Sequence, residues 1–205
     1  MIVLAAFLVA LAAAVGFHLL PEEAESTSPA RPVPPSGNAP MRTLGISLQL
    51  HNSDPSIPYE QYISEIATTG ADTVSLVVAG YQENCASTSI FVDVRKTPPD
   101  DRIRRLVGHA RSEGLRVILM PIVLLENPRS GEWRGKISPA SWDDWWEDYG
   151  NFVLHYAQLA RDAKVDLMMI GSELVSTETQ EDRWTSLIDR IRDVFPGRLS
   201  YSANW

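Results

Sequence analysis

The sequence predicts an α/β protein of the (β/α)8 TIM-barrel type, on three observations. Short apolar runs alternate with amphipathic segments, as in a parallel sheet covered by helices. The segments after the apolar runs are long and polar, whereas the returns to the next run are short, which is typical of barrels that build a site at the C-terminal ends of their strands. A doubly wound sheet would usually carry a glycine-rich turn after its first strand, and the turn at residues 50–58 (LHNSDPSIP) has no glycine.

Five strands and four helices are expected, and the order of the elements alternates throughout. The expected strands are residues 43–50, 72–80, 115–123, 165–171 and 197–205, and the expected helices are residues 58–70, 99–114, 138–163 and 179–195. Gly70 and Gly114 should end the first two helices, and Ser138 followed by a proline should begin the third. The barrel is therefore expected to be truncated after strand five, with that strand as an open edge.

The N-terminal part of the chain is expected to lie outside the fold. Residues 1–20 are interpreted as a signal peptide or a transmembrane signal anchor, because residues 2–20 carry no charged side chain and would span about 28 Å as a helix. Residues 21–41 are rich in proline and small polar residues, which predicts a disordered tether. The remaining residues, 42–205, form the partial barrel. We expect a secreted or membrane-anchored, extracytoplasmic protein that contacts the membrane if its N-terminal segment is uncleaved.

Composition excludes several functional classes. The net charge of −8 and 44% hydrophobic content indicate a folded core and argue against a nucleic-acid partner, which would need a basic face. Cys85 is the only cysteine, lies in a polar stretch and has no histidine nearby, so it is interpreted as a free thiol in a loop. No phosphate-binding loop and no metal-ligand spacing are present, so we expect neither a cofactor nor a metal.

The stretch MMIGSELVS, residues 168–176, places a carboxylate directly after a buried strand. Glu173 should therefore lie at the mouth where barrel enzymes hold their catalytic groups. A retaining glycosidase uses two carboxyl groups about 5–5.5 Å apart, one as acid/base and one as nucleophile. The alternative is a structural carboxylate that pairs with a neighbouring Lys or Arg, or that caps the fourth helix.

Several stretches resemble glycoside hydrolase family 113, which consists of clan A barrel enzymes known for β-mannanase activity. The similar parts are GSEL at residues 171–174, SANW at residues 202–205, and WRGKISP with the following WDDWWEDYGNFVLHYA at residues 133–157. The resemblance spans residues 45–205 and implies that Glu173 is the general acid/base. The clan more commonly has Asn before this Glu, where it helps to hold the sugar 2-hydroxyl, and Ser172 stands there in this chain. It also implies a nucleophile at the end of a seventh strand.

Polar and aromatic residues near the strand ends are candidate contacts for an oligo- or polysaccharide, because aromatic faces stack on sugar rings and polar groups fix orientation. These candidates are His51, Asn52, Tyr81, Trp133, Arg134, Ser172, Asn204 and Trp205. His51 is equally suited to organising its own loop. Glu83 and Glu126 follow the second and third strands and are the other carboxylates able to reach the mouth, although no motif supports them.

Two functions from different classes follow. The first is a glycoside hydrolase that acts on β-linked glycans such as β-mannan by a retaining two-carboxylate mechanism, and residues 1–205 are expected to be inactive alone because the strand-seven nucleophile is missing. The alternative is a non-catalytic glycan-binding or cell-envelope scaffold module with a degenerate barrel. Sequence beyond Trp205 would discriminate between them.

Overall fold

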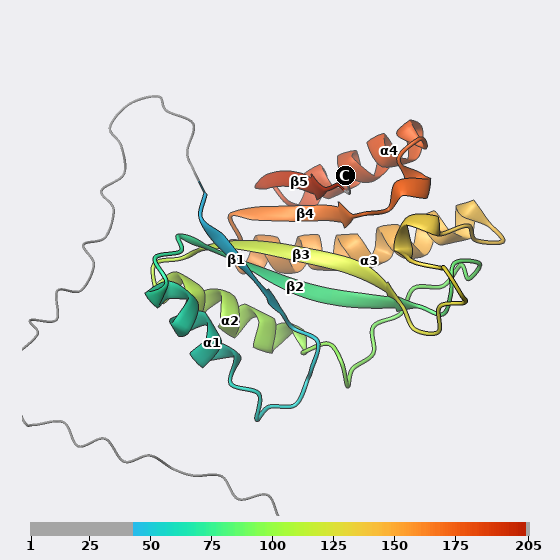
Figure 1. The fold of residues 1–205 in the computed structure, drawn as a ribbon. Helices are drawn as coiled ribbons and strands as arrows, with labels where there is room; N and C mark the ends of the chain where they lie inside the picture. The colour runs from blue at the N-terminus through green and yellow to red at the C-terminus, as the bar shows by residue number, and fades with distance from the viewer. Residues whose placement is uncertain (1–42, 204–205) are drawn as a thin grey trace, which may run out of the picture. The chain divides into compact units, whose positions relative to one another are not determined.

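The computed structural model describes residues 43–203, in which a parallel sheet carries helices on one face (Figure 1). The strands are β1 (Gly45–Gln49), β2 (Thr73–Gln82), β3 (Arg116–Leu125), β4 (Leu167–Ser172) and β5 (Arg198–Ser202). The helices are α1 (Tyr59–Thr68), α2 (Asp100–Ser112), α3 (Trp142–Asp162) and α4 (Glu181–Val194), with short 3-10 helices η1 (Arg134–Lys136) and η2 (Val175–Thr177).

Some predictions fall on residues that the structure does not describe. The signal or anchor segment at residues 1–20, the tether at residues 21–41, and both Asn204 and Trp205 lie outside the described residues. Over residues 43–203, none of the helices has the length and apolar character needed to span a membrane.

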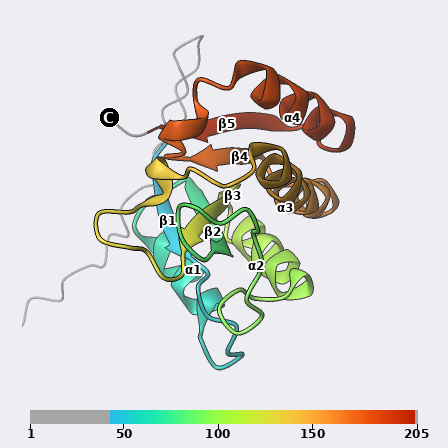
Figure 2. The same cartoon turned by 90° about the vertical axis from the view of Figure 1, so that its right-hand side faces the viewer.

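The strands lie side by side in the order in which they occur in the sequence. Each strand is parallel to the next, so the sheet order is β1-β2-β3-β4-β5, as predicted. Figure 2 shows the sheet as an arc, with α1 to α4 on its convex side. Because all strands run the same way, the loops after β2, β3 and β4 meet at one end of the sheet (Figure 1).

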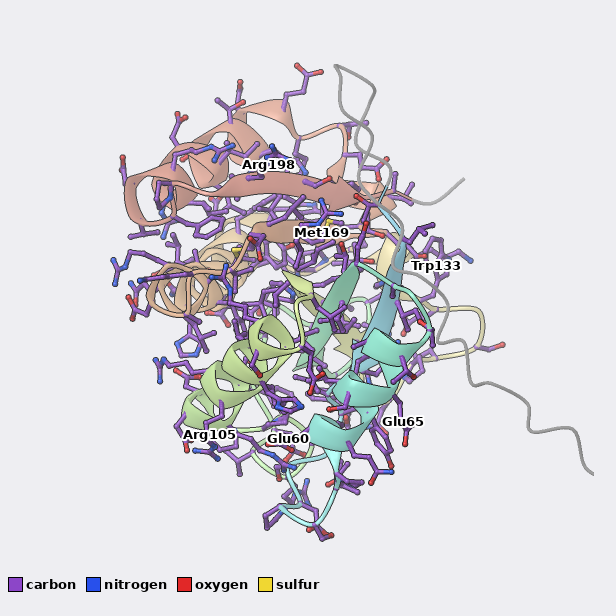
Figure 3. The ribbon with its side chains drawn as sticks, turned by 90° about the vertical axis from the view of Figure 1, so that its left-hand side faces the viewer. Glu60, Glu65, Arg105, Trp133, Met169 and Arg198 are labelled. Carbon is purple, nitrogen blue, oxygen red and sulfur yellow. The ribbon has the colours of Figure 1, made fainter. Side chains whose placement is uncertain are left out.

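The core lies between the sheet and the helices. Alternate residues of β2, including Leu76 and Val78, face α1 to α3, while Val77 and Ala79 face the concave side with Ile122. Charged residues such as Glu65 of α1 and Arg105 of α2 lie at the surface (Figure 3).

The aromatic residues of α3 pack against the sheet and against α4, as their helical spacing predicts. The Trp145 ring stacks on Tyr149 with centroids 4.8 Å apart, and the Tyr149 hydroxyl donates to the carbonyl of Ile170 at 2.8 Å. Trp146 meets Trp184 of α4 edge to face at 5.1 Å. These contacts tie α3 and α4 to β4, the strand that precedes Glu173.

The third helix begins later than predicted. Its N-cap is Ser141, whose hydroxyl accepts from the backbone N–H of Asp144 at 3.3 Å, rather than Ser138. The reason is that the N–H groups of Ser138 and Ala140 donate to the carbonyls of Cys85 and Ala86 at 2.7 and 3.2 Å, which holds this segment along the loop after β2 and outside the helix. By contrast, Gly70 and Gly114 do end α1 and α2, with positive φ values of 84° and 78°.

Candidate active site

Glu173 follows β4 directly and has an unusual backbone conformation. Its φ is 54°, and among the non-glycine residues from 43 to 203 only Lys164 shares a positive φ. Lys164 lies just past the end of α3, where this conformation is common, whereas Glu173 lies between a strand and a short 3-10 helix. Such a conformation costs about 1–3 kcal/mol and persists where the surroundings impose it, often at active sites.

The side chain of Glu173 is paired with Arg134. The guanidinium Nη2 of Arg134 lies 2.6 Å from Oε2 of Glu173, and the two side chains are 25% and 32% exposed. Arg134 begins η1 in the loop after β3, so the loops after two neighbouring strands meet at this ion pair. The carboxylate thus pairs with a neighbouring Arg, which was the structural alternative for this residue, and the pair holds it against the loop after β3.

Buried polar atoms without a hydrogen-bond partner gather at the same end of the sheet. Over the described part of the chain these atoms are Nε2 of His51, Nε of Arg134 and Oγ of Ser176. The three residues follow β1, β3 and β4 respectively. Most buried polar groups in proteins are paired, so unpaired ones ask for an explanation. All three atoms lie in loops at the end of the sheet where Glu173 lies.

Trp133, a predicted sugar contact, lies in the loop after β3 (Figure 3) and directly precedes Arg134 in the chain. Its indole packs directly over Gly135, where any Cβ would collide with the ring. The Trp133 carbonyl accepts from the backbone N–H of Lys136 at 2.8 Å and from the thiol of Cys85 at 3.5 Å. Cys85 is free and buried, so it anchors this loop from within.

His51 and Asn52, in the loop after β1, lie in different environments. Asn52 is exposed, and its side-chain oxygen accepts from the N–H of Asp54 at 2.8 Å, which organises the turn. The backbone of Asn52 exchanges two 3.1 Å hydrogen bonds with the hydroxyl of Tyr59. His51 is half-buried, and burial lowers the pKa of its imidazole below the usual 6.5. The imidazole is therefore neutral near pH 7 and has one ring nitrogen without a partner.

Tyr81 lies inside β2 rather than in the loop after it, which corrects the predicted strand end. The pairing of β2 with β3 continues to Gln82 and Leu125, two residues beyond the ends that the apolar runs indicate. Tyr81 is only 5% exposed on the concave face, where the Lys96 amine lies 4.6 Å from its ring centroid. Ser172 ends β4 and is 3% exposed. Sugar binding by either residue stays a prediction.

The other candidate carboxylates have structural partners. Both oxygens of Glu126 accept from Lys96 at 2.6 Å, and Glu83 accepts from the side-chain amide of Asn127 at 2.7 Å. These contacts join the loops after β2 and β3. Residues 43–203 contain no cluster of three or more His, Cys, Asp or Glu side chains suited to a metal ion.

Tyr201, which lies in β5, was not predicted from the sequence as part of the site. Its hydroxyl accepts from the N–H of Leu174 at 2.8 Å and donates to Oε1 of Glu178 at 3.0 Å. A tyrosine near the end of a strand, opposite Gly171 in the preceding strand, was the available signal. Only the pairing of β4 with β5 in the folded chain shows that the Tyr201 hydroxyl reaches the backbone of Leu174, the residue after Glu173.

Comparison with known proteins agrees with this architecture. A family model described as Glycoside Hydrolase Family 113 matches residues 58–205. A search of the curated proteins finds no match. Among solved structures, the chain is similar to the β-mannanase AaManA from Alicyclobacillus acidocaldarius, solved in complex with ManMIm, with a TM-score of 0.73 and 26% identity over 79% of this chain and 54% of that chain. A β-1,4-mannanase of family 113 gives a TM-score of 0.71 and 27% identity over 78% of this chain and 55% of that chain.

The chain spans about half the length of these solved relatives. Five parallel strands in sequential order, each followed by or preceded by an outer helix, constitute part of a (β/α)8 barrel, so the fold class predicted from the sequence is confirmed. The match over residues 58–205 covers most of the chain and all elements from α1 onward. The chain therefore belongs to glycoside hydrolase family 113.

Proposed function

We propose that this chain carries the acid/base portion of a retaining glycoside hydrolase that acts on β-linked glycans, with β-mannan as the first candidate. The observation that carries the proposal is the position of Glu173, directly after β4 in a family 113 domain. Support for mannan comes from the similar β-mannanases, one of which was solved with the ligand ManMIm. The activity of the whole enzyme is part of the proposal, since the match covers about half of each relative.

In this reaction Glu173 acts twice. It first gives a proton to the glycosidic oxygen as that oxygen leaves, and it then takes a proton from the water that hydrolyses the glycosyl-enzyme intermediate. The second carboxylate is the nucleophile, which the family resemblance places on a seventh strand, so we assign it to no residue of this chain. Glu83 and Glu126 are already bound to Asn127 and Lys96.

The test compares the chain, and the longest polypeptide that its reading frame encodes, on manno-oligosaccharides and on other β-linked glycans. Glu173→Gln should lower hydrolysis by about 10²–10⁴-fold, the usual contribution of general acid catalysis. Glu147→Gln is the matched control, because Glu147 is exposed on α3, and it should leave the rate unchanged. Products should keep the configuration of the substrate. Hydrolysis that survives Glu173→Gln would remove Glu173 from the mechanism.

The Arg134–Glu173 ion pair favours a second candidate, a domain that binds glycans without cleaving them. In that case the unpaired atoms of His51 and Arg134 serve binding alone. Calorimetric titration with manno-oligosaccharides distinguishes the two, since a binding module gives heat of association and no reducing ends.

We further propose an extracytoplasmic location from the composition of residues 1–20, to be tested by fractionating cells that express the full chain.

A further inference from the structure

Two consecutive backbone amides at the start of the loop after β4 are bound by the neighbouring strand β5. The N–H of Glu173 donates to the carbonyl of Ser202 at 2.8 Å. The N–H of Leu174 donates to the hydroxyl of Tyr201, also at 2.8 Å. These two bonds flank Glu173, and they hold it in its left-handed conformation at a φ of 54°. The bond to Ser202 joins two backbone groups, whereas the bond to Tyr201 depends on a single side-chain oxygen.

Tyr201 is itself firmly placed. Its ring meets Trp184 edge to face, with centroids 5.6 Å apart and planes at 84°. Both rings lie against Gly171, where an added Cβ would come within 2.7 Å of Tyr201 and 2.9 Å of Trp184. The strand therefore needs a glycine two residues before Glu173 so that the tyrosine can reach Leu174.

The direction of the Tyr201 hydrogen bonds is also fixed. Its O–H donates to Oε1 of Glu178 at 3.0 Å, which leaves a lone pair for the N–H of Leu174. Burial raises the pKa of Tyr201 to about 12, so the phenol keeps its proton at any pH suited to a carboxylate enzyme. Glu178 follows η2 directly. The Tyr201 hydroxyl therefore makes a hydrogen bond near each end of the segment from Glu173 to Glu178.

We propose that Tyr201 is a positioning residue for Glu173. By holding the Leu174 amide, its hydroxyl fixes the backbone from which the Glu173 carboxylate projects, and with it the direction in which that carboxylate meets the glycosidic oxygen. The proposal rests on the proposed function for the role of Glu173. The anchor itself is a property of the fold that is measurable without any substrate.

The first experiment measures hydrogen exchange at the backbone amides of Glu173 and Leu174 by NMR. Tyr201→Phe removes only the hydroxyl and keeps the ring between Trp184 and Gly171. It should speed exchange at Leu174 about 5-fold or more, the factor expected for one net hydrogen bond, and should loosen Glu173 as well. Tyr62→Phe is the matched control, because Tyr62 is 38% exposed on α1, and it should change neither amide.

A second variant tests the same anchor by another route. Gly171→Ala keeps the phenol but pushes the Tyr201 ring away, so it should raise exchange at Leu174 as Tyr201→Phe does. If this variant does not fold, Tyr201→Phe decides the matter alone. Unchanged exchange at Glu173 and Leu174 in a folded Tyr201→Phe protein overturns the proposal, whether or not the protein is active.

The second experiment uses the longest product of the reading frame and two substrates that differ in their leaving group. A manno-oligosaccharide needs a proton on its leaving oxygen, whereas an aryl β-manno-oligoside releases a phenolate without one. A misplaced Glu173 should lower kcat on the oligosaccharide by about 10- to 100-fold, with little change in KM, and should affect the aryl substrate far less in glycosyl-enzyme formation.

The outcomes separate the two proposals. Equal losses in the rate of glycosyl-enzyme formation on both substrates would show a general structural role for Tyr201 and overturn its assignment to Glu173. A wild-type protein that cleaves neither substrate would instead defeat the proposed function, and the amide exchange would still decide whether Tyr201 holds the Glu173 backbone. Faster exchange together with a selective loss on the oligosaccharide supports the assignment.

Discussion

Replacing Gln82 by Leu should destabilise the protein strongly, because this side chain completes three buried hydrogen bonds at the end of β2. Gln82 is 0% exposed. Its Nε2 donates to the carbonyls of Asn84 and Ser87, both at 2.8 Å, and its Oε1 accepts from the indole N–H of Trp145 at 2.8 Å. One side chain thus joins the loop after β2 to α3.

Leu has a similar size but no polar atoms, so the substitution leaves the indole N–H of Trp145 and the carbonyl of Ser87 without these partners, whereas the carbonyl of Asn84 keeps the N–H of Ser87 at 3.2 Å. A buried unsatisfied donor or acceptor costs about 1–3 kcal/mol. The indole N–H is fully enclosed, whereas the two loop carbonyls can gain water if the loop moves. We therefore expect a loss of about 3 kcal/mol in the free energy of unfolding, which is a drop in Tm of about 6–12 °C for a domain of this size.

The assay is thermal and urea unfolding followed by circular dichroism. Gln61→Leu is the matched control, because Gln61 is exposed on α1 and makes one hydrogen bond, to Glu65 at 2.8 Å. That variant should stay within about 0.5 kcal/mol of wild type. If the free energy of unfolding of Gln82→Leu lies within about 1 kcal/mol of that of Gln61→Leu, water or rearrangement satisfies the freed groups and the reasoning from burial fails.

Three further predictions concern packing and pH. Gly80→Ala should destabilise the fold by about 1–3 kcal/mol, because its Cβ would lie 2.6 Å from the Phe152 ring. Gly108→Ala, on the open face of α2, should stabilise the fold by up to about 1 kcal/mol. Urea unfolding measures both changes. Burial raises the pKa of Tyr201 to about 12 from 10.0, so its contribution to stability is complete below pH 10 and lost as pH rises through about 12; alkaline melts of Tyr201→Phe should show a weaker decline. Burial lowers the pKa of His51, so the unfolded chain binds the proton more tightly and stability falls as pH drops below 6.5. His51→Gln should flatten this dependence of stability on pH. An unchanged slope would assign the pH dependence to other groups.

Local patterns in the chain were sufficient to predict the order and type of the elements. Apolar runs and helical periodicity are local properties, so strands and helices were predicted within a few residues, and Gly70 and Gly114 marked two helix ends correctly. The contrast between long and short loops led to the sequential strand order, because it reflects which end of a parallel sheet carries the site. The position of Glu173 after β4 followed from the same pattern.

The contacts of each candidate side chain became known only once the chain was seen folded. Arg134, predicted to bind sugar, holds the Glu173 carboxylate at 2.6 Å, a contact that the sequence did not indicate, and Tyr201, unnoticed in the sequence, binds the amide that follows Glu173. Ser141 caps α3 in place of Ser138 because Ser138 and Ala140 both donate to the loop after β2, which keeps this segment out of the helix. Such contacts join segments that are distant in the chain, and their geometry depends on strand register and packing, which no local pattern of residues encodes.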